Sequence, residues 1–250
     1  MSLHVETAGA AVVLKIDRPQ RHNAIDRATA MAIGDAVRKA SADPAVRAVI
    51  LTAAGDRVFC AGGDLNEIQA ALDAGTPAAV SSVVEPLATI EDCDVPVIAA
   101  VQGDVFGGGA ELLMLCDLVI IEEHVHIAFR HARMGLSPAW GGLTRLLERV
   151  GPLEASRILL TAEKVTAGDA LRIGLVSEVV PRGFVQERAL ARASHIADNP
   201  RDTVAALKRT LREARAAIRA PAVAVEREAF LARWGGPDHL AAMQAFRDRK

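Results

Sequence analysis

Two short, almost entirely apolar runs constrain the fold more than any other feature of the sequence. They read "VRAVILTA" (46–53) and "VPVIAAV" (95–101). Runs of this length and composition are typical of strands that are covered on both faces, as in parallel sheets. Helical patterns separate them, so right-handed strand–helix–strand crossovers are expected over about the first 180 residues. The predicted fold class is therefore α/β with a mainly parallel sheet.

The two ends of the chain add to this pattern. Residues 3–17 alternate around Gly9 and predict a hairpin, and Asp26 is expected to cap a helix that ends near Ala42. From Val185 onward the pattern is helical, with breaks expected at three prolines: Pro200, Pro221 and Pro237. We therefore predict an α/β core over 1–184 and a C-terminal helical region over 185–250.

Composition and charge exclude several classes of protein. A hydrophobic content of 51% in 250 residues supports a substantial core. The formal charge of −2, from 29 basic and 31 acidic residues, gives no broad field for nucleic acid or anionic lipid. Three cysteines without a CxxC pair indicate neither a disulfide framework nor a zinc site. The first twenty residues hold charges and no long apolar segment, so a cytoplasmic protein without a membrane span is expected.

Two glycine-rich entrances to helices carry the strongest chemical signal. They read "VFCAGGDLNEI" (58–68) and "GDVFGGGAELLMLCD" (103–117). A helix N-terminus presents unpaired N–H groups, and glycine lets an acceptor approach them closely. Neither loop contains GxGxxG or GK[ST], so nucleotide phosphate is disfavoured. Two amides that converge on one thioester oxygen would stabilise its enolate. The alternative is that these glycines only permit tight packing.

Two acids accompany these entrances. Glu111 lies three residues after Gly108 and shares its helix face, so its carboxylate is expected beside the amide. Its leucine-rich neighbours predict apolar surroundings, which suit general acid or base work, and the alternative is a surface glutamate. At the other entrance Asp64 is expected to cap the helix, with Glu67 completing a capping box.

Four stretches in this order resemble the crotonase superfamily, also called the enoyl-CoA hydratase/isomerase family. They are "RPQRHNAI" (18–25), "FCAGGDL" (59–65), "GGGAELLMLCD" (107–117) and "GLVSEVV" (174–180). The resemblance implies a crotonase-like ββα superhelix with mainly parallel sheets and a C-terminal helical region. It also implies assembly as a homotrimer or dimer of trimers, with the helical region as interface and CoA cover.

The same resemblance implies a set of site residues. The amides of Gly63 and Gly108 would form an oxyanion hole for the carbonyl of a CoA thioester. No cofactor is implied beyond the CoA moiety of the substrate. The CoA contacts would fall on two loops and on the last helix, at Arg21, Ala24, Ala61, Leu65, Phe246 and Arg249.

The sequence departs from the family's hydratase pattern after Val125. Hydratases of this family use two glutamates; the first matches Glu111, but no Asp or Glu occurs between Glu123 and Glu148. The stretch "FRHARMGLSPAWGGLTRL" and the tail "RWGGPDHLAAM" are closer to the ethylmalonyl-CoA decarboxylase branch, which carries an acid at the position of Arg133.

Three functions follow from this comparison. Decarboxylation of a short 2-alkylmalonyl-CoA is the main expectation, because loss of carbon dioxide produces the enolate without a base. Glu111 would orient the substrate or return the proton, and His131, whose imidazole titrates near neutral pH, is the competing donor. The alternative is a 2-enoyl-CoA hydratase or isomerase. A second alternative, from another class, is a catalytically idle scaffold or RNA-binding member.

Other polar residues are given structural roles. His124 and His126 have no evident third ligand, so no metal site is predicted. Cys60 is interpreted as a small buried filler, and Trp140 is expected to border the acyl site. Four basic residues at helical spacing are interpreted as a solvated face: Lys208, Arg212, Arg215 and Arg219.

Overall fold

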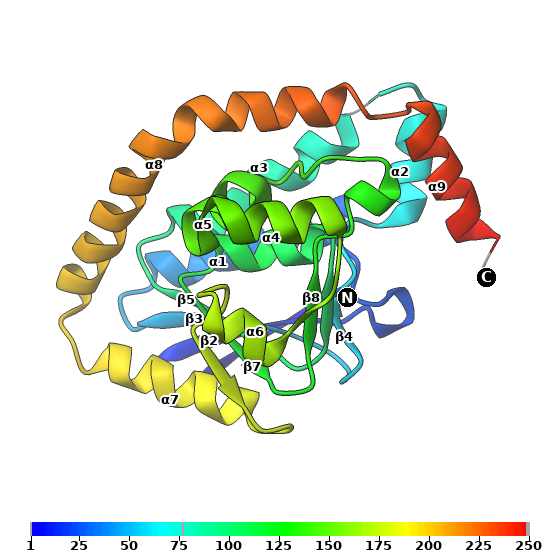
Figure 1. Cartoon of the computed structure of the whole chain (residues 1–250). Coiled ribbons are helices and arrows are strands. Elements are labelled where there is room, and N and C mark those ends of the chain that lie inside the picture. The colour runs from blue at the N-terminus through cyan, green and yellow to red at the C-terminus, as the bar shows by residue number, and fades with distance from the viewer. Residues whose placement is uncertain (1, 77, 249–250) are drawn as a thin grey trace.

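The strands form two sheets, which a computed structural model of the chain describes over residues 2–76 and 78–248 (Figure 1). The six-stranded sheet contains, in spatial order, β1 (Leu3–Ala8), β2 (Ala11–Ile16), β3 (Ala48–Ala53), β5 (Val97–Val101), β7 (Leu118–Glu122) and β10 (Glu178–Val180). The four-stranded sheet contains β4 (Val58–Cys60), β6 (Asp104–Phe106), β8 (His126–Ala128) and β9 (Val165–Thr166).

Strand pairing in both sheets is mainly parallel. Among the described strands only β1–β2 and β8–β9 pair antiparallel. The two apolar runs become β3 and β5, and both strands are buried along their whole length. The prediction of an α/β fold with mainly parallel sheets is confirmed.

Helices cover both faces of the larger sheet. On one face, Val185, Ala189 and Ala193 of α7 (Val185–Ala197) pack against small aliphatic side chains of the strands. The opposite face carries α1 (Arg27–Ala42), α3 (Ala78–Asp92), α4 (Gly108–Leu115) and α5 (Gly142–Thr161), which kinks at Gly151. Short helical elements complete the core: η1 (Pro19–Arg21), α2 (Leu65–Asp73), η2 (Ala132–Met134) and α6 (Ala167–Arg172).

Local sequence signals place the N-terminal elements as predicted. Gly9 adopts a φ of 61° between β1 and β2, which pair as a hairpin. The Asp26 carboxylate accepts a hydrogen bond of 2.7 Å from the Thr29 amide, and α1 ends at Ala42.

The C-terminal helices are α7, α8 (Arg201–Leu231) and α9 (Pro237–Arg247). The chain leaves helical structure before Pro200, and α9 begins at Pro237, as predicted. The expected break at Pro221 is wrong, because α8 continues through it. Proline removes one hydrogen bond but a helix can tolerate this by bending, and Figure 1 shows α8 bending across the top of the molecule. No described helix is long and apolar enough to cross a membrane.

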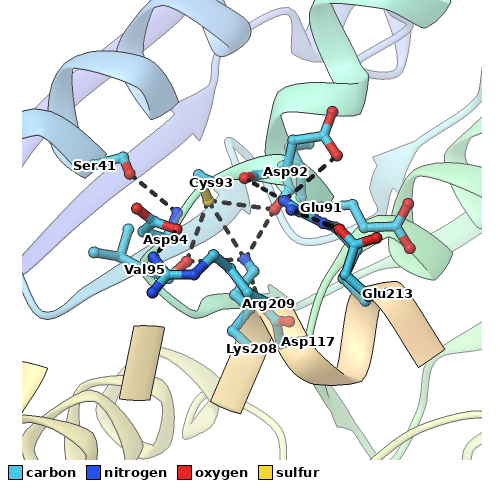
Figure 2. A network of polar contacts seen from close by, with 12 residues as sticks. Ser41, Glu91, Asp92, Cys93, Asp94, Val95, Asp117, Lys208, Arg209 and Glu213 are labelled. Atoms are coloured by element: carbon cyan, nitrogen blue, oxygen red, sulfur yellow. Dashed lines mark hydrogen bonds and ion pairs between the residues drawn. The ribbon is translucent and has the colours of Figure 1, made fainter. Parts of the chain in front are cut away.

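Two residues of the basic stripe, Lys208 and Arg219, are buried against the body of the protein, so the interpretation as a solvated face is wrong for them, whereas Arg215 is exposed as that interpretation expects. Lys208 Nζ lies 2.8 Å from the Asp117 carboxylate and donates to the Val95 carbonyl at 2.9 Å (Figure 2). Its side chain is 6% exposed, which excludes a role as a solvated cation. The neighbouring Cys93 thiol is mostly buried, and burial raises its pKa.

Further along α8, Arg219 makes a second set of ion pairs. Its guanidinium contacts Glu91 at 2.8 Å and Glu148 at 2.6 Å, and its side chain is 7% exposed. Burial alone would raise the pKa of Glu91, but hydrogen bonds and charge from Arg145 and Arg219 lower it below its ordinary value. These contacts hold α8 against its own chain.

Candidate active site

Three consecutive glycines open α4, and each meets a different steric limit. Gly107 has a φ of 53°, which disfavours other residues. A Cβ on Gly108 would lie 2.8 Å from the Trp140 ring, and a Cβ on Gly109 would overlap the Cys60 carbonyl oxygen. Tight packing therefore explains both positions: Gly109 packs against a carbonyl group, and Gly108 packs against the aromatic ring of Trp140.

The Gly63 and Gly108 amides lie on two loops that touch. The Ile25 amide donates to the Gly62 carbonyl at 2.8 Å and the Asp64 amide donates to the Ile25 carbonyl at 3.0 Å, an arrangement that leaves the Gly63 amide between them unpaired. A Cβ on Gly62 would lie 2.9 Å from the Gly108 nitrogen. Within residues 2–76 and 78–248, neither the Gly63 nor the Gly108 amide donates to a protein acceptor.

The Trp140 ring packs across both loops. It is 3.8 Å from a Cβ placed on Gly63 and 2.8 Å from one placed on Gly108, and the residue is 8% exposed. The structure thus places Gly63 and Gly108 against the same indole ring, which supplies an apolar wall.

Arg18 and Asn23, which the sequence argument missed, fix the first loop. The Arg18 guanidinium lies 2.8 Å from Asp26 and donates to Asp64 at 2.9 Å. Asn23 is 1% exposed, and its Nδ2 donates to the Ala54 and Val58 carbonyls at 2.9 and 2.8 Å. Burial alone would raise the pKa of Asp64, but the Asn66 amide and Arg18 lower it. Arg18 and Asn23 both lie within the stretch 18–25 quoted above, so their polar side chains were the only indication in the sequence of a role in this loop.

The expected CoA-contact residues fall into two groups. Arg21 ends η1, and Ala24 follows it with its amide donating to the Arg21 carbonyl at 3.1 Å. The Ala61 amide donates to the His22 carbonyl at 3.1 Å, and Leu65 begins α2, so these four residues lie on adjoining loops. Phe246 is 40% exposed on α9, and Arg249 lies outside the described residues.

The predicted capping box at Asp64 is only half formed. The Asp64 carboxylate caps α2 by accepting from the Asn66 amide at 2.9 Å. The Glu67 carboxylate accepts from the Arg27 amide at 2.9 Å, because the Asp64 amide is already used by Ile25. Glu67 therefore joins the start of α1 to α2.

Glu111 projects from α4 into a pocket of donors. The residue is 1% exposed. Its Oε2 accepts from the Trp140 and Gly142 amides at 2.7 and 2.9 Å, and its Oε1 accepts from the Ala139 amide at 3.3 Å. The expectation of apolar surroundings is wrong, because the backbone at the start of α5 turns its N–H groups toward this carboxylate.

His131 is the fourth partner of Glu111. Its Nε2 lies 2.9 Å from Glu111 Oε1, and its side chain is 12% exposed. An ionised carboxylate has about four acceptor positions, which these contacts fill. Nε2 therefore carries the proton of the neutral ring, and Nδ1 keeps its lone pair. His131 Nδ1 is buried and has no hydrogen-bond partner in the described part of the chain.

A second buried carboxylate comes from α8. Glu226 is 4% exposed and accepts from the Leu143 and Thr144 amides at 3.4 and 3.1 Å. Burial raises the pKa of Glu226 above its ordinary value, and the charge of Glu111 raises it further. Glu226 lies far outside the stretch between Glu123 and Glu148, where the family resemblance implies a second acid. The sequence contains one indication of its position: Glu226 lies seven residues after Arg219, so it falls on the same helix face as the basic stripe of α8.

The first turn of α9 covers the end of η2. A Cβ on Gly135, which follows η2, would lie 2.6 Å from the His239 nitrogen, and His239 is 1% exposed. Trp234 packs against His239, with ring centroids 5.1 Å apart and ring planes tilted by 51°. Arg133, at the position where the decarboxylase branch carries an acid, is exposed on η2. It does not face the Glu111 carboxylate.

Cys60 sits beneath the two glycine loops and is fully buried. Burial raises the pKa of its thiol to about 12. A thiol of this kind stays protonated at neutral pH, so the interpretation as a buried filler agrees with the structure.

Comparison with known proteins identifies the class of protein. The chain matches the model of the enoyl-CoA hydratase/isomerase family over residues 6–250, and it belongs to this family. The resemblance to the crotonase superfamily is confirmed.

Three similar proteins carry hydratase or dehydratase names. The chain is 36% identical over 213 residues to a carnitinyl-CoA dehydratase of Proteus mirabilis, covering 84% of this chain and 80% of that protein. It is 35% identical over 240 residues to a crotonyl-CoA hydratase of Syntrophomonas wolfei, covering 95% and 92%. The structure of a carnitinyl-CoA hydratase from Mycobacterium avium superposes with a TM-score of 0.86 at 34% identity, covering 100% of this chain and 96% of that one.

Proposed function

We propose that the protein is an enzyme that adds water reversibly to a 2-enoyl-CoA thioester. The observation that carries the proposal is the pair of unpaired amides, Gly63 and Gly108, beside the buried Glu111–His131 pair. The hydratase and dehydratase names of the relatives support hydration over the decarboxylation expected from the sequence.

In this proposal the thioester oxygen accepts hydrogen bonds from the Gly63 and Gly108 amides. Negative charge develops on that oxygen as the enolate forms, and each donor contributes about 3 to 4 kcal/mol to the transition state. The Trp140 ring excludes water from one side of this oxygen, which strengthens the electrostatic interaction.

His131 exchanges the proton. Its Nδ1 takes a proton from water, the hydroxyl oxygen bonds to C3, and the electron pair of the double bond moves through C2 to the thioester oxygen. The proton then returns to C2 as the carbonyl re-forms. Glu111 holds the imidazole by Nε2 and stabilises its charged form.

Binding and assembly follow the family resemblance. CoA would lie along Arg21, Ala24, Ala61 and Leu65, with Phe246 of α9 and Arg249 as further contacts that the family resemblance implies. We propose a homotrimer or dimer of trimers, no cofactor beyond CoA, and no nucleic-acid or membrane partner in a cytoplasmic enzyme.

Decarboxylation of a 2-alkylmalonyl-CoA is the second candidate. It is favoured by one observation: no acid lies between Glu123 and Glu148, so that stretch supplies no second carboxylate to hold the water. The same two amides would stabilise the enolate, and His131 in its protonated form would donate to C2.

A mass-spectrometric screen decides between these candidates. The purified protein is incubated with crotonyl-CoA, carnitinyl-CoA, methylmalonyl-CoA and ethylmalonyl-CoA. Gain or loss of water is the expected result. Loss of carbon dioxide from the malonyl esters alone would replace hydration by decarboxylation, and inertness with salt-sensitive RNA binding would favour an RNA-binding member.

A further inference from the structure

Two carboxylates that lie far apart in the sequence hold the backbone at and just before the start of α5. Glu111 takes the Trp140 and Gly142 amides, and Glu226 takes the Leu143 and Thr144 amides. These amides belong to neighbouring residues, so each carboxylate holds part of one short stretch of backbone. A change in the position of Glu226 therefore changes the position of the donors that hold Glu111.

Glu226 reaches the start of α5 because α8 docks beside it, and not because the two lie close in the sequence. The helix docks through Lys208 on Asp117 and through Arg219 on Glu91 and Glu148. Glu226 follows on the same face and is 4% exposed. Its neighbours Arg227 and Glu228 are exposed, so the helix turns this one acid inward.

We propose that Glu226 is a positioning residue for the Glu111–His131 pair: it holds the start of α5 in place, and its charge sets the pH range in which the pair works. This proposal rests on the function proposed above. In this proposal Glu226 does not donate a proton to the substrate. It acts by holding the backbone at the start of α5 and by placing a negative charge near the Glu111–His131 pair.

The charged groups around Glu226 support an electrostatic role. On α4 the buried Glu111 faces it and repels a second negative charge. On α5 the nearest cation along the chain, Arg145, is bonded to the Gly141 carbonyl and paired with Glu91. Because Glu226 and Glu111 repel each other, loss of the Glu226 charge removes a negative neighbour from the Glu111–His131 pair, so the protonated form of the pair as a whole becomes less favourable.

The kinetic test compares two variants of Glu226 with matched variants of Glu228, which lies on the same helix and is exposed. Glu226→Gln removes the charge and keeps an oxygen acceptor for the closer amide, that of Thr144, while its NH₂ group replaces the oxygen at the longer contact with Leu143. We expect it to hold kcat within about threefold and to move the acid limb of the pH–rate profile down by about half a pH unit. Glu226→Ala also removes the acceptor, so kcat should fall by about tenfold while KM stays within about twofold.

Variants Glu228→Gln and Glu228→Ala should match the wild type in both readouts. A merely structural role for Glu226 would lower the amount of folded enzyme without moving the pH profile of what remains. Wild-type kcat and an unmoved profile in both Glu226 variants would overturn the proposal. If Glu226→Ala does not fold, the profile of Glu226→Gln decides alone.

A substrate-free measurement separates this proposal from the proposed function. Hydrogen exchange of the Trp140 and Gly142 amides should accelerate by about tenfold in Glu226→Ala and stay unchanged in Glu228→Ala. Unchanged exchange in both variants refutes the positioning role whatever the substrate is. Inertness of the wild type toward every CoA ester refutes the proposed function and leaves the exchange result standing.

Discussion

Glu111→Gln replaces one carboxylate oxygen with an NH₂ group of similar size, yet it should disable the site. The carboxylate accepts from Trp140, Gly142 and Ala139 and meets His131 Nε2. An amide has one acceptor oxygen and one NH₂ group, which only donates. If the oxygen keeps the two shortest amide bonds, the NH₂ group faces the Ala139 amide and the imidazole.

The imidazole must then reverse its tautomer. Nε2 becomes the acceptor for the new NH₂ group, so the proton moves to Nδ1 and the lone pair for water is lost. A wrong tautomer of this kind lowers kcat on the order of 10³- to 10⁴-fold in other carboxylate–histidine pairs. Each hydrogen bond lost from a buried charged group is worth about 1.5 to 3 kcal/mol, so unfolding free energy should fall by about 3 kcal/mol.

The assay follows loss of the enoyl-thioester absorbance for Glu111→Gln, His131→Ala and the double variant. Glu123→Gln, an exposed acid that follows β7, is the control. The double variant should lose no more than the worse single variant, because the two residues act as one unit. CoA affinity by calorimetry should stay within about threefold, since neither residue lies in the CoA loops. A wild-type kcat in Glu111→Gln, or additive losses, would refute the coupling.

Three further predictions concern packing, docking and pH. Gly108→Ala should lower kcat by about tenfold or more, because its Cβ would lie 2.8 Å from the Trp140 ring, whereas Gly168→Ala has open space and should not. Arg219→Ala should lower the unfolding free energy in denaturant by about 3 kcal/mol, since it leaves Glu148 without this partner and Glu91 with Arg145 alone, and a loss below about 1 kcal/mol would contradict this. The raised pKa of Glu226 means that the folded state keeps its proton above the ordinary value of 4.5, so its contribution to stability is complete below that pH and declines as pH rises. The stability of Glu226→Gln relative to wild type should therefore increase from acid to neutral pH, and a constant difference would show that Glu226 does not titrate this way.

Local patterns predicted most of the fold because each depends on a few neighbouring residues. Apolar runs defined β3 and β5, and Asp26 marked the start of α1. The error at Pro221 shows the limit of local rules, because contacts made by the rest of α8 keep the helix continuous despite one missing hydrogen bond.

The candidate site was predictable only where its residues lie in one motif. Gly63, Gly108 and Glu111 follow from two loops. The Glu111–His131 contact could be proposed as a choice of roles but not as a geometry, because it depends on how η2 packs against α4. The sequence does not predict a role for Glu226, because its partners, Leu143 and Thr144, lie more than eighty positions away. Periodicity alone does not tell whether a charged helix face meets water or an opposite charge.

The oxyanion hole is tested most directly by the infrared spectrum of crotonyl-CoA, labelled with ¹³C at the thioester carbonyl, bound to Glu111→Gln. Two amide donors on the oxygen should shift the carbonyl band to lower frequency than in free solution, because they draw charge onto the oxygen. A bound ligand whose carbonyl band stays at its solution frequency would contradict the account.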